Sequence, residues 1–440
     1  MGFPRRSVPF LSALAVASAL PLSQALAQTA APAPTPELSA ADTAWMITAS
    51  MFVLLMFVPG LALFYGGMVR KKNVLSMLMQ SFFSAALLTV LWVAVGYSLT
   101  FTEGNPFFGG LGKAMLTGIK PETLSGTIPE FVFVMFQCTF AIITPMIIMG
   151  GPADRMKFSS AMVFLALWML FAYVPVAHMV WGPGGFLMNA GVLDFAGGTV
   201  VHINSGVAGL VAALMIGRRK GGGVEPMAPH NLVLTMVGGS LLWVGWFGFN
   251  AGSALTSGAL AGLALINTQI AAAAATVSWV VVEWLAKGRP SLLGAVSGAV
   301  AGLVVITPAC GFVSPGSAMV MGLAGGIACC AGATVMKKAL GVDDALDVFG
   351  VHGVGGILGA VLTGVFASAA YGGEGKSGWI DGNFAQIGLQ IEGVVVTVLW
   401  TAVVSVVALK LIDVVMGLRV DAEVETDGLD LALHGETVHS

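Results

Sequence analysis

The sequence predicts an all-α membrane protein with eleven transmembrane helices. Hydrophobic residues make up 57% of the chain and charged residues only 9%, whereas a soluble domain carries about 25% charged residues. The 59 glycines in 440 residues are typical of apolar helices that pack closely in a membrane. Apolar runs recur along most of the chain between short polar loops, as expected for helices that each need about 20 apolar residues to span a bilayer.

The first 44 residues lie outside this pattern. Arg5 and Arg6 precede an apolar stretch, and Ala25 and Ala27 flank Leu26 in the small-x-small pattern that precedes a cleavage point. Residues 1–27 are therefore expected to be an export signal peptide. The alternative is a retained anchor helix, although the apolar run is short for a span. Residues 28–44 are rich in Ala, Pro and Thr and are expected to be a mobile leader in the periplasm.

The membrane domain is expected over residues 45–416, with the N-terminus outside and the C-terminus inside. Its spans are centred near Phe57, Ala86, Ile142, Leu167, Leu210, Leu242, Ala273, Gly302, Gly326, Val361 and Val403. Lysine and arginine test this topology independently, because they collect in inner loops. The predicted outer loops hold Lys113, Lys120 and Lys376, and the predicted inner loops hold Arg70, Lys71, Lys72, Arg155, Lys157, Arg218, Arg219, Lys220, Lys287, Arg289, Lys337 and Lys338.

Two histidines, His202 and His352, each lie in a nearly charge-free apolar run. An ionisable residue in a span is costly to keep and indicates a functional site, although a single such histidine is more often a satisfied core residue. The two fall on the fifth and tenth spans, which predicts two five-helix halves followed by an extra eleventh helix. Because five is odd, the halves would form an inverted pair with the substrate path along their interface.

Other functional classes lose support from the motifs. The sequence has no phosphate-binding GxxxxGK[ST] loop, no GxGxxG after a strand and no GxSxG. The four cysteines lie in apolar surroundings and imply neither a disulfide nor a metal framework. We therefore expect no enzyme and no ATP-driven pump, and neither a metal nor another cofactor. The net charge of −3 gives no reason to expect a nucleic-acid partner.

Two aspartates lie close to the histidines along the chain. Asp194 is near the outer end of the fifth span, and either binds a cation or caps the helix start by accepting backbone N–H bonds. We favour the structural role. Asp347, near the inner start of the tenth span, is interpreted in the same way.

Four segments carry a resemblance to a known family. The strings FYGGMVRKKNVLSM (Phe64 to Met77), DFAGGTVVH (Asp194 to His202), WVGWFGFNAGSAL (Trp243 to Leu255) and DVFGVHGVGG (Asp347 to Gly356) are similar to the bacterial ammonium transporters of the Amt/Rh family. The resemblance covers nearly the whole membrane domain and the tail. It implies a homotrimer in the bacterial inner membrane, with one pore per subunit that conducts ammonium nitrogen. It also implies methylammonium as a candidate second substrate.

Residue matching within the resemblance implies a recruitment site and a gate. Phe140 and Phe249 match the stacked pair that closes the outer mouth, and Trp181 and Ser253 match the outer recruitment site, which Phe136 completes. The chemistry agrees, because an aromatic face attracts a cation by ~0.5 to 2 kcal/mol and a hydroxyl oxygen accepts an N–H bond.

The paired histidines imply passage of ammonia rather than ammonium. A bare cation in an apolar pore faces a penalty of roughly tens of kcal/mol. An ammonium ion with a pKa of ~10 needs only about 4 kcal/mol to deprotonate at neutral pH. Neutral imidazoles then offer ammonia both a donor and an acceptor, and they can relay the released proton.

The tail, residues 417–440, is polar and acidic, and on composition it is a solvated end. It nevertheless resembles the tail by which bacterial members of the family dock a trimeric PII-type signalling protein, and stabilisation of the trimer is the alternative. The matching residues are Gly417, Leu418, Arg419, Val420, Gly428, Leu429, Asp430, His434 and Gly435. A rival function is an ammonium sensor that signals through such a partner without useful flux.

Overall fold

The computed structural model describes residues 37–222 and 227–438. Within these residues, ten helices are long and apolar enough to cross a membrane. A further apolar helix, α12 (Leu292–Ile306), is shorter. Together they coincide with the spans expected from hydropathy, and the all-α membrane architecture is confirmed. The expected signal peptide, and the expected leader as far as residue 36, lie outside the described residues.

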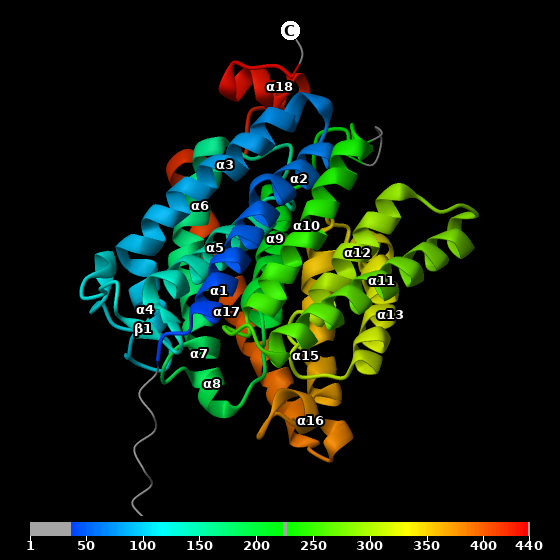
Figure 1. Ribbon diagram of the computed structural model, residues 1–440. Coiled ribbons are helices and arrows are strands. Elements are labelled where there is room, and N and C mark those ends of the chain that lie inside the picture. The colour runs from blue at the N-terminus through cyan, green and yellow to red at the C-terminus, as the bar shows by residue number, and fades with distance from the viewer. Residues whose placement is uncertain (1–36, 223–226, 439–440) are drawn as a thin grey trace, which may run out of the picture. The chain divides into compact units, whose positions relative to one another are not determined.

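The first five spans consist of α-helices (Figure 1). Several of these helices are joined end to end by π-helical turns. The helices are α1 (Ala40–Leu55), α2 (Ala62–Met68), α3 (Val74–Leu91), α4 (Tyr97–Phe101), α5 (Glu130–Ile148), α6 (Phe158–Trp168), α7 (Val174–Trp181), α8 (Phe186–Ala190) and α9 (Asn204–Ile216). The π-helical turns are η1 (Met56–Leu61), η3 (Trp92–Gly96), η5 (Met169–Tyr173) and η6 (Gly198–Ile203). Strands β1 (Leu124–Ser125) and β2 (Ile128–Pro129) form an antiparallel pair before α5.

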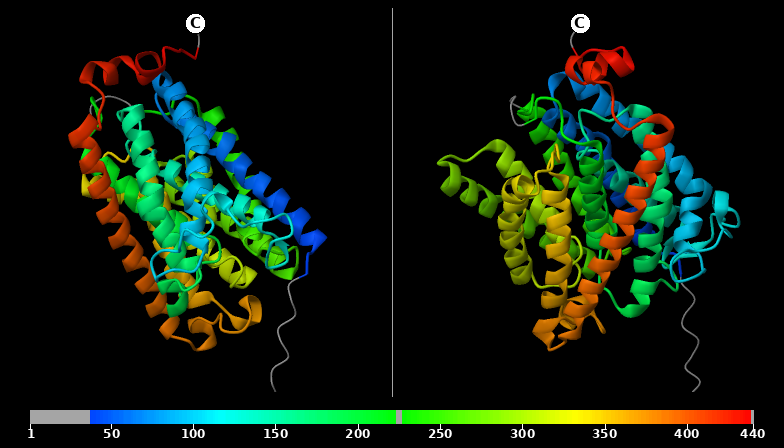
Figure 2. Two further views of the ribbon diagram at one scale, coloured as in Figure 1. Left: turned by 90° about the vertical axis from the view of Figure 1, so that its left-hand side faces the viewer. Right: turned by 180° about the vertical axis from the view of Figure 1, so that it is seen from behind.

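The remaining spans contain fewer π-helical turns. Their helices are α10 (Leu232–Gly252), α11 (Ala259–Lys287), α12, α13 (Pro315–Ala331), α14 (Lys337–Leu340), α15 (Val354–Phe366), α16 (Ala369–Gly372) and α17 (Ala385–Met416). The π-helical turns η7 (Gly332–Met336) and η8 (Phe349–Gly353) precede α14 and α15. Helix α11 packs against α12 and α13, whereas α17 packs against α15, α9 and α6. Figure 2 shows α17 running alongside the other helices toward the tail.

Helix α1 begins before the expected start of the membrane domain at residue 45. The Ser39 side chain accepts a hydrogen bond from the Asp42 N–H at 3.2 Å, which caps the helix at Ala40. The Asp42 carboxylate in turn accepts bonds from the Ser257 N–H at 2.8 Å and the Thr127 hydroxyl at 2.7 Å. These partners lie far away in the sequence, so the apolar pattern alone could not place the first turn.

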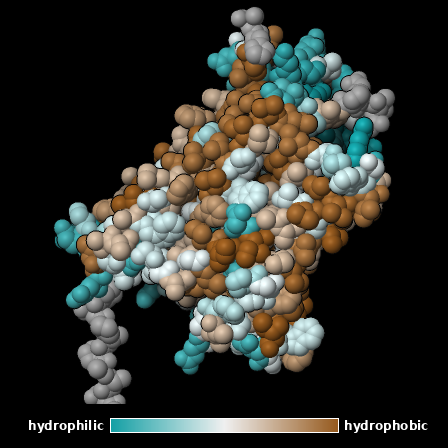
Figure 3. All heavy atoms as spheres, turned by 45° about the vertical axis from the view of Figure 1, so that its right-hand side comes forward, coloured by the Kyte–Doolittle hydropathy of each residue, from teal (hydrophilic) through white to brown (hydrophobic). Residues whose placement is uncertain are grey.

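The two ends of the helices form two polar faces. We call the face with residues 417–438 and the loops 69–73, 149–157, 217–222 and 341–348 the tail face. The opposite face, with residues 102–129, 182–197, 253–258 and 367–384, is the loop face. Figure 1 shows α18 (Ala422–Asp427) beside the ends of α2 and α3, and α8 and α16 at the opposite end. In Figure 3, hydrophilic residues gather near the tail, and hydrophobic residues cover much of the visible side.

The tail is folded against the tail face rather than free in solvent. The Lys157 N–H donates to the Leu418 carbonyl at 2.9 Å, and the Val420 N–H donates to the Arg155 carbonyl at 3.1 Å. Further along, the Asp430 carboxylate accepts the N–H groups of Leu75 at 3.0 Å and Ser76 at 2.8 Å, which lie in the first turn of α3. The tail thus supplies the polar cap of a membrane helix.

Candidate functional site

The two histidines meet in the interior of the bundle. Nδ1 of His202 and Nδ1 of His352 lie 3.2 Å apart, and their ring centroids are separated by 5.3 Å. His202 is fully buried and His352 is 6% exposed. One ring must donate and the other accept in this bond, so the neutral pair holds a single proton between its Nδ1 atoms. Nε2 of His202 is buried without a hydrogen-bond partner among the described residues.

Both histidines lie in π-helical turns, His202 in η6 and His352 in η8. The helices that carry them cross at glycines placed four residues after each histidine. A Cβ atom at Gly206 would lie 2.3 Å from the Gly353 nitrogen, and one at Gly356 would lie 2.9 Å from the Ile203 nitrogen. The backbone contact is therefore reciprocal, and this close approach brings the imidazoles within hydrogen-bonding distance.

The Asp194 carboxylate is engaged with the start of η6. It accepts the N–H groups of Gly197, Gly198, Thr199 and Val200 at 2.7 to 3.0 Å. Burial raises the pKa of this carboxyl group, and the four backbone bonds oppose that rise. With its oxygens occupied by N–H donors, the carboxylate has the geometry of a helix cap.

In the second half the corresponding cap is Asp344. The prediction that Asp347 caps the start of the tenth span is therefore corrected. The Asp344 carboxylate accepts the Phe349 N–H at 2.8 Å, whereas the Asp347 carboxylate pairs with Lys337 at 2.7 Å. The spacing gives the reason, because Asp194 and Asp344 both precede their histidine by eight residues. Asp347 is three residues closer to His352, where its φ of 59° directs it to another neighbour.

A series of rings leads from the loop face to the histidines. The Phe140 ring lies 6.0 Å from Trp181 in an edge-on arrangement and stacks on Phe249 at 4.1 Å. Phe249 in turn stacks near His202 at 6.1 Å. Phe140 and Phe249 are at most 1% exposed. The stacked pair therefore separates the loop face from the histidines.

Sequence reasoning missed Trp246, which stacks on the His202 ring with centroids 5.3 Å apart. Its indole N–H donates to the Thr307 hydroxyl at 2.9 Å, which fixes the ring plane. Trp246 lies in the WVGWFGFN string, three residues before Phe249. Helical spacing places i and i+3 on the same face, so the sequence contained a signal for this contact.

A vestibule of about 290 Å³ opens above the stacked phenylalanines. Phe140, Trp181, Asp194 and Ser253 are among the residues that line it. The Trp181 indole N–H donates to the Asp194 carbonyl at 2.9 Å, and the Ser253 hydroxyl donates to the Phe249 carbonyl at 2.8 Å. The Ser253 hydroxyl has therefore used its proton, and its oxygen retains acceptor capacity.

Phe136 is placed differently from the expectation. It is fully buried and is absent from the residues that line the vestibule. Its ring lies 5.0 Å from Phe140, which it supports from within the helix packing. Phe133, Gln137 and Phe140 occupy the wall instead, because their spacing of four and three residues places them on one face of α5.

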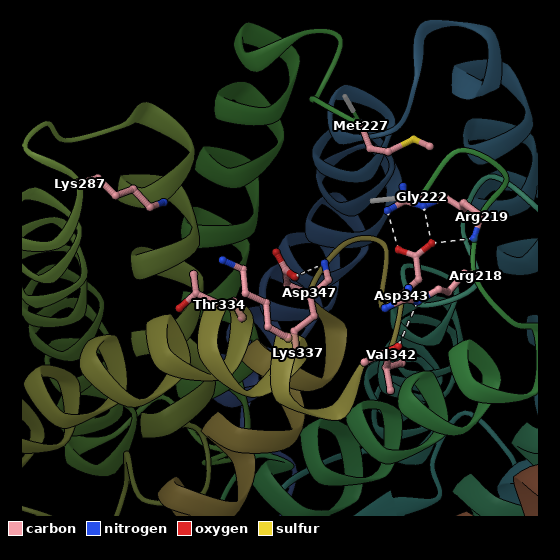
Figure 4. Close-up of a pocket in the computed structure, with 13 residues that line it drawn as sticks. Arg218, Arg219, Gly222, Met227, Lys287, Thr334, Lys337, Val342, Asp343 and Asp347 are labelled. Atoms are coloured by element: carbon pink, nitrogen blue, oxygen red, sulfur yellow. Dashed lines mark hydrogen bonds and ion pairs between the residues drawn. The ribbon is translucent and has the colours of Figure 1, made fainter. Parts of the chain in front are cut away.

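On the other side of the histidines, a small cavity is lined by His352, Tyr65 and Asp347. Asp347 also lines a larger cavity of about 570 Å³ at the tail face, together with Arg218, Arg219, Lys287, Lys337, Lys338 and Asp343. Figure 4 shows Asp343 paired with Arg219, and Lys337 paired with Asp347. More cations than anions line this cavity, whereas one cation, Lys376, and one anion, Asp194, line the vestibule beside six aromatic residues.

Comparison with known proteins identifies the family that this arrangement belongs to. The profile described as Ammonium Transporter Family matches residues 44–439. The chain belongs to the ammonium transporter family. An ammonium transporter of Bacillus subtilis (strain 168) is 49% identical over 400 residues, covering 90% of this chain and 98% of that protein. The residues that match the family profile include the π-helical turns and the vestibule.

Solved structures of the family share the fold. The crystal structure of Saccharomyces cerevisiae Mep2 matches with a TM-score of 0.82 and 37% identity, covering 88% of this chain and 89% of that chain. The structure of a sensor Amt protein matches with a TM-score of 0.82 and 30% identity, covering 90% of this chain and 98% of that chain. The expected resemblance to ammonium transporters is thus confirmed.

Proposed function

We propose that the protein conducts ammonium nitrogen across a bacterial inner membrane, with the loop face outside. Ammonium is recruited in the vestibule at Trp181, Phe140 and Ser253, loses a proton near the stacked phenylalanines, and passes His202 and His352 as ammonia. The observation that best supports this proposal is the continuous series of rings from Trp181 through Phe140 and Phe249 to the hydrogen-bonded histidines.

The sequence of steps follows from the chemistry of each place. In the vestibule, an aromatic face attracts the cation and the Ser253 oxygen accepts one N–H bond. Below it, Phe140 and Phe249 exclude water, and an unpaired cation would lose roughly tens of kcal/mol of hydration. Deprotonation at neutral pH costs about 4 kcal/mol, so the neutral molecule is the species that crosses.

The histidine pair supports the neutral species and offers a route for the proton. Nε2 of His202 lacks a partner among the described residues, so it is available for a hydrogen bond with ammonia. The shared Nδ1 proton connects His202 to His352, and a change of tautomer in both rings would move a proton along the path. Asp194 and Asp344 position the two turns, and their roles are structural.

Electrical recording on proteoliposomes tests this function. An ammonium pulse given to vesicles that contain the purified protein should produce ammonium-dependent flux, which a pH-sensitive dye inside the vesicles also reports. Empty vesicles, and vesicles with the Phe249→Ala variant, are the controls. Equal responses from protein-containing and empty vesicles would refute transport. Internal alkalinisation without a current would show that ammonia crosses without its proton, whereas a current without alkalinisation would show that the proton crosses as well.

A second candidate is an ammonium sensor, which the match to a sensor Amt protein favours. A sensor binds ammonium in the vestibule and changes the tail face, without conducting at a useful rate. Binding with no flux in the same vesicles would favour this alternative over transport.

Two further proposals concern assembly and regulation, and they rest on the family resemblance. The subunits form a homotrimer with one pore in each, and a PII-type signalling protein docks on the tail face. The tail supports docking because Gly417 to Val420 are held against the body by the bonds of Leu418 and Val420. Methylammonium is expected to be a second, weaker substrate.

A further inference from the structure

Gln137 is a polar side chain at the vestibule whose oxygen has no partner among the described residues. It lies on α5, is 9% exposed, and lines the vestibule together with Phe140, Trp181 and Ser253. Its Oε1 atom is buried without a hydrogen bond from any described residue. Buried side-chain oxygens are usually paired, because an unpaired acceptor costs free energy. An unpaired acceptor beside a cation site therefore points to a ligand that donates.

The amide group suits such a ligand. Its oxygen has two lone pairs and carries no charge, so it can accept an N–H bond and yet release the ion again. The Gln137 oxygen is buried, although the residue lines the vestibule. The oxygen and nitrogen of an amide exchange places by a half turn of the terminal group. Gln137 can therefore turn its oxygen toward a cation that arrives beside Phe140.

We propose that the Gln137 side-chain oxygen is a direct acceptor for ammonium in the vestibule, and that it contributes to selection of ammonium over methylammonium. This inference rests on the proposed function. Ammonium has four N–H bonds in tetrahedral directions, so it can bond Ser253 and Gln137 in any orientation. Methylammonium has three, and its methyl group must avoid both acceptors. Methylammonium can still bond both acceptors through its three N–H groups, so the discrimination comes from the restricted orientation of its methyl group.

A comparison within the chain separates this role from packing. Gln80 on α3 is also a buried glutamine, 4% exposed, with an Oε1 that lacks a partner among the described residues. Its Nε2 donates to the Ser76 hydroxyl at 3.4 Å, and it is not among the residues that line the vestibule. Gln80→Leu is therefore the matched control for removal of a buried amide.

The test compares Gln137→Leu, Gln137→Glu and Gln80→Leu in proteoliposomes, with ammonium and methylammonium each titrated against initial rate. Gln137→Leu should raise the apparent KM for ammonium roughly three- to tenfold, the loss expected for one hydrogen bond, and leave the maximal rate within about twofold. The ratio of kcat/KM for ammonium to that for methylammonium should fall. Gln137→Glu, which keeps the acceptor oxygens, should retain an ammonium KM at or below that of the wild type at neutral pH.

The outcomes separate this inference from the function on which it rests. An unchanged ammonium KM and unchanged selectivity in Gln137→Leu would overturn the inference, provided that Trp181→Leu raises KM in the same vesicles. Equal loss of maximal rate in both Gln137 variants and in Gln80→Leu would assign the glutamine a packing role and would also overturn it. If the leucine variant does not fold, the KM of Gln137→Glu decides, and a raised value refutes the role. Absence of flux in the wild type would instead refute the proposed transport.

Discussion

His202 and His352 share one hydrogen bond, yet they face different surroundings. His202 lies against Trp246 and below Phe249, whereas His352 lines the small cavity toward the tail face. Removing either imidazole should leave the fold intact and alter conduction, because each variant breaks the 3.2 Å contact. We expect His202→Ala and His352→Ala to change both labelled methylammonium uptake and charge movement. Wild-type values of both quantities in both variants would refute the paired-histidine mechanism.

Trp181 and Phe249 should fail in different ways. Trp181→Leu removes the aromatic face of the vestibule, and a loss of ~0.5 to 2 kcal/mol should raise the apparent KM by roughly two- to thirtyfold. Phe249→Ala removes the ring stacked 4.1 Å from Phe140, so water should enter and productive flux should be lost rather than affinity. Saturation curves for ammonium uptake measure both effects. Identical kinetic profiles in the two variants would contradict this division of roles.

Asp344 should make stability depend on pH. Burial, and then the charge of Asp347, raise the pKa of Asp344 to about 6. A carboxyl group whose pKa is raised on folding binds a proton more tightly in the folded protein. The free energy of unfolding should therefore fall as the pH rises from ~4 to ~6, by at most roughly 1.4 kcal/mol per pH unit.

Asp344→Asn tests this, because asparagine keeps an acceptor for the Phe349 N–H but does not titrate. Thermal unfolding in detergent at several pH values between 4 and 7 should show a flatter slope in this variant. Asp347→Asn is the control, and removal of its charge should move the midpoint to lower pH. The same slope in Asp344→Asn as in the wild type would exclude Asp344 as the titrating group.

At the scale of elements, the crossing of the two histidine helices depends on glycine. A methyl group at Gly206 would clash with the Gly353 nitrogen, so Gly206→Ala should force the helices apart and destabilise the fold by about 1 to 3 kcal/mol. It should also lower flux, because the histidine contact widens. The matched control is Gly388→Ala on α17, where an added Cβ meets nothing within 4 Å. Because alanine has a higher helix propensity than glycine, this substitution should be neutral or stabilising. Melting temperature and ammonium flux check both variants, and equal effects would contradict the crossing argument.

The sequence predicted where the helices lie better than how they begin or turn. Apolar runs mark the spans because the bilayer requires them. The four segments that resemble the ammonium transporters mark the helices that carry the histidines and Phe249. The start of α1 depends on Asp42 partners at Thr127 and Ser257, which no local pattern contains. The resemblance placed Phe249 beside the path correctly, but it placed Phe136 in the vestibule wall, whereas the regular spacing of α5 turns Phe133, Gln137 and Phe140 toward the vestibule. Asp347 was misjudged because Asp344, three residues earlier, has the spacing to its histidine that Asp194 has.

For the molecule as a whole, the tail is an ordered segment that packs against the loops of the tail face. Arg419 pairs with Glu425 at 2.7 Å and donates to the Ile216 carbonyl at 3.1 Å, at the end of the helix that carries His202. Lys220 donates its N–H to Glu425 at 2.6 Å. The tail therefore touches a pore helix as well as the loops beside it. Composition alone predicted a solvated end, because these contacts come from loops far away in the chain.

Truncation after Met416 should abolish docking of a PII-type protein and have a smaller effect on flux. It removes the Gly417 to Val420 anchor as well as the Asp430 cap of α3. Co-sedimentation of the cognate PII-type protein with membranes measures docking, with and without its nucleotide effectors. The Glu425→Gln variant is a milder companion, since it loses the ion pair but retains the chain. Equal retention of the partner by full-length and truncated protein would refute the docking proposal.

The π-helical turns that carry His202 and His352 are each one residue longer than an α-helical path over the same rise. Deleting one residue from η6 would restore the regular i to i−4 ladder and rotate the imidazole by about 100° about the helix axis. The chain would gain local regularity and lose its paired imidazoles. Selection for thermostability alone would therefore disfavour the π-helical turns that pair the imidazoles. Engineered deletions that convert η6 or η8 into regular α-helix are expected to raise stability and lower transport activity.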